Sequence, residues 1–414
     1  MSSTPKMLHL TAEIVKRVYH PGRVLGEGSD GIVQIFHDRK DNSRQIAVKY
    51  PIGTKTSSSL MTELAVLQHL QKHQRTHENI VTMLGFDKAW IPHSPAIFMD
   101  YCELGDLWHY RLSVSFFEEL TLWKLFADMA KGLHFLHAEQ PVPILHGDFK
   151  PLNILVQRPP GNTEKIVVLP IFKLADFARA TPMNRQVIEQ TKWKFAGTPE
   201  YAPCRAERKN ATLAADIWAC GATLQFFAFG RNPTVSMRKF RQQHPELDAL
   251  NDEQIRYHLP FKFRPLTAGP DVQVNELDVS KEYQSPGYSE RLNKWYSLCV
   301  QPDIDSRITA HELMEAVVPV AESKIKIGLA KRAVEEHQLK LEKLKKPGKS
   351  AVAPPEKPTA SLLAPPPIAI PPTVPPRPQV PNWMTRKEAL RKAMVENAQE
   401  NGKIPPPLLE RRDR

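Results

Sequence analysis

Strand-like and helical patterns occupy different parts of this chain, and that separation constrains its fold more than any other feature. The runs 31–36, 46–50 and 96–100 are short and rich in β-branched or aromatic residues, as strands are. Between residues 120 and 137, apolar residues instead recur at intervals of three and four, which predicts a half-buried helix. The sequence therefore predicts an α+β fold in which a small β-rich lobe precedes a larger helical lobe.

Composition also divides the chain into segments. After an N-terminal extension of residues 1–19, alternating apolar runs and turn signals predict one folded domain over residues 20–322. Residues 323–346 predict a charged helix with too few heptads for a coiled coil. Residues 347–382 are rich in proline and predict a disordered linker. Residues 383–414 predict a basic tail with a short helix.

Charge and cysteine content limit the setting and the partners. The 414 residues carry a formal charge of +11, but lysine and arginine are spread along the chain, so we expect no nucleic-acid partner. The 4 cysteines lack the spacing of metal ligands or of a disulfide framework. Neither a signal peptide nor a membrane-spanning run is recognisable, so we expect an intracellular protein, in cytoplasm or nucleus. The sequence leaves its oligomeric state open.

Three glycines, Gly26, Gly28 and Gly31, precede a strand-like run. Glycine lets backbone N–H groups approach phosphate oxygens because no Cβ intervenes. Dinucleotide-binding folds use the same spacing but continue into a helix, whereas here a strand follows. For this motif alone, an ordinary glycine-rich hairpin is an equally good interpretation.

Lys49 ends the next apolar run, and a lysine there can reach phosphates if a carboxylate holds it. Glu63 is the candidate partner, on a helix indicated by leucines at 60, 64, 67 and 70. Taken alone, two such residues are more often separate surface charges.

The segment 144–156 sets His146, Asp148, Lys150 and Asn153 among apolar residues. It resembles the catalytic loop of the eukaryotic protein kinase family, and the run 176–178 resembles that family's metal-binding Asp-Phe-Gly element. The resemblance implies a two-lobed kinase fold with an antiparallel sheet in the small lobe. It also implies a serine/threonine kinase that uses ATP and Mg²⁺ and acts on protein substrates.

Roles for individual residues follow from this resemblance. Asp148 would orient the substrate hydroxyl, and Lys150 would stabilise the transferring phosphoryl group. Thr198, in the run 197–203, would bond both and favour Ser/Thr substrates. The remaining implied residues are Lys49 and Glu63 for the phosphates, and Asn153 and Asp176 for Mg²⁺. Nucleotide contacts are implied for Leu25, Gly26, Gly28, Gly31, Val33, Ala47, Lys49, Met99, Asp100, Cys102, Asp106 and Leu155.

Three departures from the family pattern have consequences. Gly147 stands where most regulated kinases have an arginine that meets an activation-loop phosphate, so we hypothesise that activity does not require phosphate on Thr181 or Thr191. Ala178 replaces the glycine of Asp-Phe-Gly and narrows the backbone angles there. Cys204 stands where a buried glutamate is expected, which predicts that Glu207 pairs with Arg307 instead.

Two other function classes remain open. A pseudokinase scaffold would bind ATP and recruit partners through its tail, but the key side chains for catalysis are all present. A small-molecule phosphotransferase of the aminoglycoside or choline type ranks third, because it leaves the run 197–203 unexplained. Residues 372–377 fit a partner that recognises proline-rich peptides, although a plain spacer is the commoner role for such a stretch.

Overall fold

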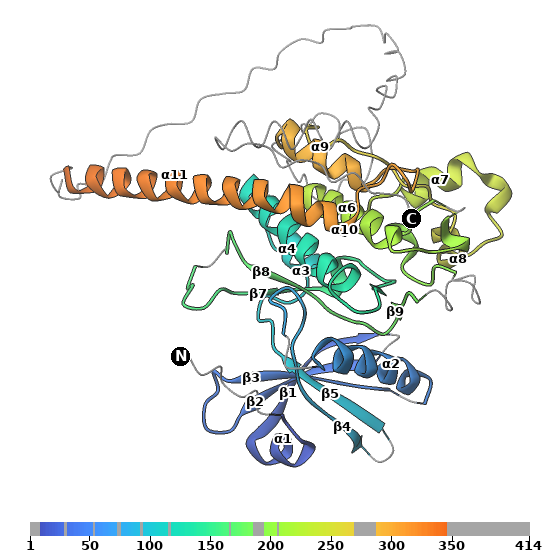
Figure 1. The fold of residues 1–414 in the computed structure, drawn as a ribbon, viewed down its shortest axis with the longest axis vertical. Helices are drawn as coiled ribbons and strands as arrows, with labels where there is room; N and C mark the ends of the chain where they lie inside the picture. Colours follow the sequence, from blue (N-terminus) through green and yellow to red (C-terminus); the bar gives the residue numbers. More distant parts are fainter. Residues whose placement is uncertain are drawn as a thin grey trace, which may run out of the picture.

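The computed structural model describes residues 9–28, 31–52, 54–72, 76–91, 94–114, 117–164, 167–184, 194–204, 207–268 and 287–345. These residues form a small β-rich lobe and a larger helical lobe, which confirms the predicted α+β fold (Figure 1). The predicted linker at 347–382, its motif at 372–377 and the basic tail lie outside the described residues, as does Thr191.

The small lobe is built on a five-stranded sheet in the order β1-β2-β3-β5-β4, with every pairing antiparallel. The three predicted strands are confirmed, each extended by one or more residues, and β1 and β4 were not predicted. The strands are β1 (Tyr19–Gly28), β2 (Gly31–Asp38), β3 (Gln45–Tyr50), β4 (Met83–Ile91) and β5 (Ser94–Asp100).

Each face of this sheet carries a helix. Successive side chains of a strand point to opposite faces. Ala47 packs with the leucines of α2 (Thr54–Leu70) in the main core, whereas its neighbours Ile46 and Val48 pack with Val15 of α1 (Ala12–Val18). The segment predicted as an extension thus contributes a helix that covers the outer face of the sheet (Figure 1).

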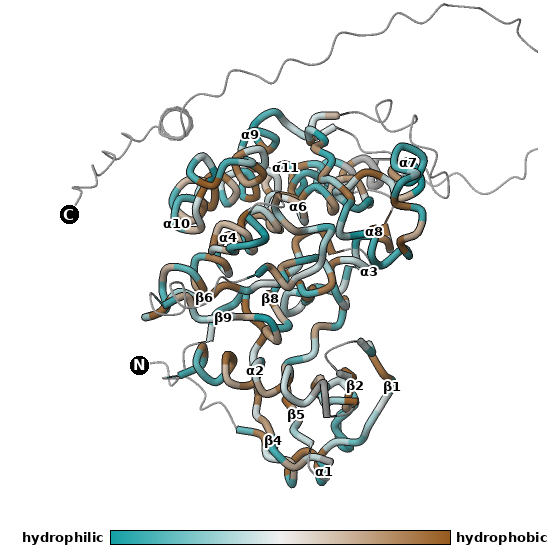
Figure 2. Tube along the Cα trace, turned by 90° about the vertical axis from the view of Figure 1, so that its right-hand side faces the viewer, coloured by the Kyte–Doolittle hydropathy of each residue, from teal (hydrophilic) through white to brown (hydrophobic). Residues whose placement is uncertain are grey.

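Two buried helices form the centre of the large lobe. The predicted helix at 120–137 is confirmed as α4 (Glu119–His137), which packs against α6 (Ala214–Phe229). Outer helices such as α7 are largely hydrophilic (Figure 2). The remaining helices of this lobe are α3 (Leu107–Leu112), α7 (Met237–Gln243), α8 (Asp252–Arg256), α9 (Glu290–Cys299), α10 (Ala310–Glu312) and α11 (Val318–Lys345).

The predicted charged helix begins earlier than its composition suggests. Val318, Val320 and Ala321 are buried in the core, so α11 starts inside the lobe, runs along α4 and then continues past it (Figure 1). A π-helical segment, Leu313–Val317, connects α10 to α11. Across the described ranges, no helix has the length and apolarity needed to cross a bilayer.

Two short antiparallel ladders lie between the lobes and shape the loops of the site. One pairs β6 (Ile144–Leu145) with β9 (Thr181–Pro182), and the other pairs β7 (Ile154–Gln157) with β8 (Ile171–Leu174). The segment 144–156 therefore enters along β6 and leaves along β7, with the one-turn helix η2 (Pro151–Asn153) between them. This frame fixes both ends of the loop that carries Asp148.

Candidate active site

A buried carboxylate in α6 fixes the backbone of this loop. Asp216 is 2% exposed and accepts hydrogen bonds from the amides of His146 at 2.7 Å and of Gly147 at 3.1 Å. His137 Nε2 lies 2.9 Å from the same carboxylate. Because hydrogen bonds to a charged group are strong, the loop is held rigidly on a core helix.

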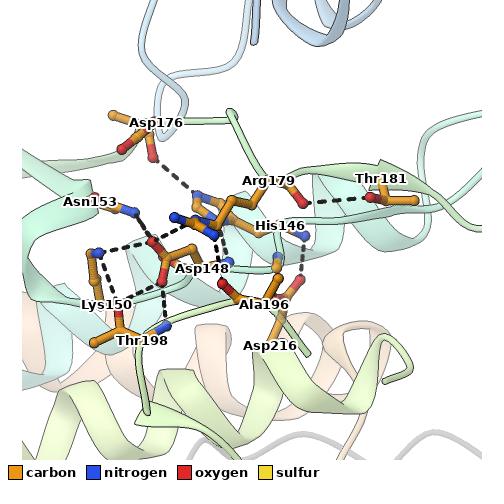
Figure 3. Close-up of polar contacts among 12 residues, drawn as sticks. His146, Asp148, Lys150, Asn153, Asp176, Arg179, Thr181, Ala196, Thr198 and Asp216 are labelled. Carbon is orange, nitrogen blue, oxygen red and sulfur yellow. Dashed lines mark hydrogen bonds and ion pairs between the residues drawn. The ribbon is translucent and has the colours of Figure 1, made fainter. Parts of the chain in front are cut away.

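The structure brings Asp148, Lys150, Asn153 and Thr198 together (Figure 3). Lys150 Nζ donates to Asp148 Oδ2 and to Thr198 Oγ1, at 2.8 Å each. Thr198 donates to Asp148 Oδ1 from its amide at 2.7 Å and from its hydroxyl at 2.8 Å. Asn153 Nδ2 donates to the Asp148 carbonyl at 2.8 Å. These contacts fix the position of the Asp148 carboxylate on several sides.

The groups around Asp148 determine its charge. Burial acts to raise its pKa, but the Lys150 ammonium and the hydrogen bonds from Lys150 and Thr198 outweigh it, so the pKa lies below its ordinary value of 3.8. Asp148 is therefore a carboxylate at neutral pH, able to accept a hydrogen bond from an incoming hydroxyl.

A second cluster joins the two lobes. Lys49 Nζ lies 2.6 Å from Glu63 Oε2 and 2.9 Å from Asp176 Oδ1. Glu63 also accepts a hydrogen bond from the Phe177 amide at 3.4 Å. Burial acts to lower the pKa of Lys49, but the two carboxylates raise it above its ordinary value, so the ammonium stays charged. The predicted pairing of Lys49 with Glu63 is confirmed, and the surface-charge alternative is wrong.

The segment that carries Asp176 adopts an unusual backbone. Asp176 has φ of 61°, the only positive value among the described non-glycine residues. Aspartate tolerates this left-handed conformation better than most residues. The next side chain, Phe177, is fully buried with its ring 5.1 Å from that of His146, which holds Asp176 toward Lys49.

The predicted nucleotide-binding residues lie around the junction of the lobes. Leu25, Val33 and Leu155 are partly buried against the main core. Ala47 pairs with Met99 across β3 and β5, and Cys102 is buried in the segment that follows β5. Gly26 and Gly28 lie at the end of β1, where a Cβ would meet nothing within 4 Å, and Gly31 begins β2 with φ of 132°.

Two of these residues already have partners for their side chains. Asp100 accepts from the Thr82 amide at 2.9 Å and from Lys173 Nζ at 2.6 Å. Asp106 caps α3 by accepting from the His109 amide at 2.9 Å, and its other oxygen lies 2.8 Å from His109 Nδ1. A ribose that contacts Asp106, as predicted, would therefore bind a carboxylate that already caps α3 and contacts His109.

The donors near Asp148 suit a hard cation. Asp176 offers a carboxylate, and the Asn153 amide is oriented by the hydrogen bond from its Nδ2, which leaves Oδ1 as its ligand atom. Mg²⁺ is usually held by one or two protein oxygen donors together with substrate phosphates and water. In the described ranges, no cluster of three or more His, Cys, Asp or Glu side chains able to hold a metal occurs.

Sequence reasoning missed Arg179. Its Nη1 donates to the Ala196 carbonyl at 2.7 Å, and its Nε lies 3.7 Å from Asp148 Oδ2 (Figure 3). Gly147 has φ of 77°, and a Cβ there would lie 2.7 Å from the Arg179 carbonyl oxygen. In the sequence, only its place directly after Ala178 marks Arg179 as a candidate site residue, since no periodicity singles it out.

Thr181, one of the two hypothesised phosphorylation sites, is buried in β9.

The predicted substitute for the missing glutamate is confirmed. Arg307 Nη1 and Nη2 donate to the two oxygens of Glu207 at 2.8 Å each, and both side chains are at most 1% exposed. Cys204, at the position where the glutamate was expected, is exposed. In this chain the buried carboxylate that pairs with Arg307 is therefore Glu207.

Comparisons with known proteins agree with this geometry. Residues 19–318 match the model of the protein kinase domain. The chain is similar to the serine/threonine-protein kinase DCLK3 of Homo sapiens, with 28% identity over 75% of this chain and 41% of that protein. It is also similar to two proteins of Dictyostelium discoideum. One is the dual specificity mitogen-activated protein kinase kinase 1, with 27% identity over 54% of this chain and 31% of that protein. The other is the probable serine/threonine-protein kinase nek2, with 26% identity over 70% and 60%.

These relatives are longer than the matched region, and this chain covers less than two thirds of each of the three. The family match, by contrast, spans most of the present sequence and contains both the Lys49 cluster and the Asp148 cluster. The two-lobed fold, the lysine held by Glu63 and Asp176, and the loop fixed by Asp216 agree with it. The chain therefore belongs to the eukaryotic protein kinase family.

Proposed function

We propose that this protein is an active serine/threonine kinase that transfers the γ-phosphoryl group of ATP to hydroxyls of protein substrates. The observation that carries the proposal is the state of Asp148, an ionised carboxylate with fixed orientation beside the positive charge of Lys150. A pseudokinase scaffold has no need of this arrangement. The four free cysteines support a reducing, intracellular setting.

Each part of the proposed reaction has a candidate in the chain. Asp148 accepts the hydrogen bond of the substrate hydroxyl and aims its oxygen at the phosphorus atom. Lys150 offsets the negative charge that develops on the transferring group. Lys49, held by Glu63, binds phosphate oxygens. Mg²⁺, held by Asp176 and Asn153, would neutralise charge on the triphosphate.

The preference for Ser and Thr rests on Thr198. Its hydroxyl and amide both contact Asp148, and Lys150 reaches the same hydroxyl. The Thr198 side chain therefore lies directly against the carboxylate, where we expect it to favour a short aliphatic alcohol. Two of the three similar proteins described above are named serine/threonine kinases and one is named dual specificity.

Phosphoryl transfer from labelled Mg·ATP to a mixture of protein substrates, followed by identification of the phosphorylated amino acid, tests the proposal. We expect phosphoserine and phosphothreonine from the unmodified protein, and a loss of at least about a hundredfold in Asp148→Asn. Equal rates in both proteins would contradict it. Nucleotide binding without any transfer would favour the scaffold instead.

A further inference from the structure

A pocket of about 130 Å³ opens beside the catalytic residues, on the side of Thr198. Lys150 and Thr198 line it, and both contact the Asp148 carboxylate. A peptide that presents a hydroxyl to Asp148 therefore runs past this pocket. The pocket is distinct from the Lys49 cluster, because neither Lys49 nor its partners line it.

The surface of its wall is mainly apolar, although five of the nine lining residues are polar or charged. Trp108 of α3 is one side, and Leu152 of η2, with 48% of its surface exposed, is another. The Trp108 ring stacks on Phe226 of α6, with ring centroids 4.5 Å apart and planes 12° from parallel, so the wall is held from behind. Tyr201, which is buried, also lines the pocket. Concave, mainly apolar sites with a few polar groups at the edge are typical of ligand subsites.

Glu200, the only carboxylate among the residues that line the pocket, is already paired with Arg256. Arg256 Nε and Nη2 donate to the two oxygens of Glu200, at 2.6 and 2.9 Å. Such bidentate pairs are the strongest geometry for arginine and carboxylate. A lysine or arginine side chain that enters the pocket thus finds no carboxylate without a partner and meets the positive charges of Arg256 and Lys150.

We propose that this pocket binds an apolar side chain of the protein substrate, next to the phosphorylated Ser or Thr, and disfavours Lys and Arg there. The inference rests on the proposed kinase function and adds the substrate class. The volume is consistent with this, since an apolar cavity of about 150 Å³ holds a benzene molecule. Leucine, methionine and phenylalanine therefore match both the size and the wall of the pocket.

A peptide library with a central serine, in which each flanking position is varied in turn, tests this on the unmodified protein. At one flanking position we expect leucine, methionine or phenylalanine to give a kcat/KM at least about tenfold above alanine, with lysine and arginine below alanine. Phosphorylation with no apolar preference at any position would overturn the inference and leave the kinase function standing. Failure to phosphorylate any peptide or protein substrate would overturn both.

Leu152→Glu places a carboxylate in the wall without an arginine partner, so we expect the preferred residue at that position to change from apolar to basic. Leu329→Glu on α11 is the matched control, because Leu329 is 47% exposed and lies outside the site. The control should keep the profile of the unmodified protein. An unchanged profile in Leu152→Glu would contradict the proposal.

A second variant keeps the test decisive if Leu152→Glu fails to fold. Arg256→Met removes the partner of Glu200 and retains an apolar stem, so it leaves a carboxylate free at the edge of the pocket. We expect peptides with lysine or arginine at the selected position to gain about tenfold in kcat/KM relative to leucine. No gain would mean that Glu200 does not face the substrate, and the proposal would be wrong.

Discussion

Arg179 forms an ion pair with Asp148, its Nε lying 3.7 Å from Oδ2. The same side chain donates to the Ala196 carbonyl, just before the run that contains Thr198. One arginine thus links its own segment, which follows Asp176, to the Asp148 carboxylate and to the segment that carries Thr198. The residue before Asp148 is Gly147, which has no side chain, so the cation beside Asp148 comes from Arg179, farther along the chain.

Arg179→Gln should lower kcat for protein substrates about fivefold and leave KM for ATP unchanged. The loss is modest because Arg179 is 37% exposed and water screens the ion pair. Steady-state kinetics with both substrates varied would measure it. Arg179→Lys should recover only part of the rate, since the single ammonium of lysine keeps the charge but cannot use separate nitrogens for Asp148 and the Ala196 carbonyl as arginine does. A large rise in KM for ATP would show that Arg179 acts at the nucleotide instead.

Gly147→Ala should impair both stability and activity. Gly147 has φ of 77°, and its Cβ would lie 2.7 Å from the Arg179 carbonyl oxygen. Gly161 has the same φ but nothing within 4 Å of its Cβ, so Gly161→Ala isolates the cost of the left-handed backbone. We expect Gly161→Ala to lose about 1 kcal/mol of unfolding free energy and keep its kcat. Gly147→Ala should lose more and fall in kcat, and equal effects at both positions would contradict the close contact.

Glu207→Gln should destabilise the large lobe by about 3 to 5 kcal/mol, because it leaves the Arg307 guanidinium buried without a counter-charge. Denaturant unfolding measures this loss. Glu322→Gln is the matched control, since Glu322 is 57% exposed and pairs with Lys131 at the surface, where the loss should stay below about 1 kcal/mol. Adding Cys204→Glu should not rescue Glu207→Gln, because Cys204 is exposed. Rescue would mean that the pair is not specific to Glu207.

The pH dependence of stability should report the charge of Asp148. Its folded pKa lies below the ordinary 3.8, so the ionised form contributes stability above that value and the contribution is lost as pH falls through the folded pKa. Asp148→Asn lacks this contribution at every pH. The difference in unfolding free energy between the two proteins should therefore be constant at neutral pH and shrink in the acid range. A difference that grows as pH falls would contradict the assigned direction.

Mutation of the activation segment would test the remaining sequence hypothesis. Thr191→Ala should leave peptide phosphorylation within about twofold of the unmodified protein, because Gly147 lacks the cation that an activation-loop phosphate would neutralise. Thr181 is a poor probe, since it is buried in β9, the strand that pairs with β6, and the loss of its side chain would disturb packing. A collapse in the rate of Thr191→Ala, with unfolding unchanged, would refute the hypothesis.

Sequence patterns located the strands with clear β-propensity and the long helix α4, because those elements carry their own periodicity. They missed β1 and β4. β1 contains Pro21 and several glycines, and in β4 Gly85 lies against the backbone of Leu10, so neither run looks like a strand by composition. These strands form because β2 and β5, their neighbours in the sheet, offer backbone hydrogen bonds to them.

In the candidate site, too, some residues could be identified from the sequence and others could not. Lys49, Asp148 and Asp176 were identifiable because their spacings and order form a recognisable set. The pairs Arg179 with Asp148 and Arg256 with Glu200 were not, since arginine is common on surfaces and nothing in the local sequence names a partner. The pair of Glu207 with Arg307 was predictable only from the family pattern, because Cys204 stands where that pattern has a glutamate.

Lys49 has two anionic partners on opposite sides of the junction, one on α2 and one beside the large-lobe loop. Under the proposed function, a triphosphate that binds there adds a third anion to a cation that already has two carboxylate partners. The affinity proposed for nucleotide therefore depends on how these anions share one ammonium, and removing the charge of Glu63 or Asp176 should alter nucleotide binding together with the contact between the lobes.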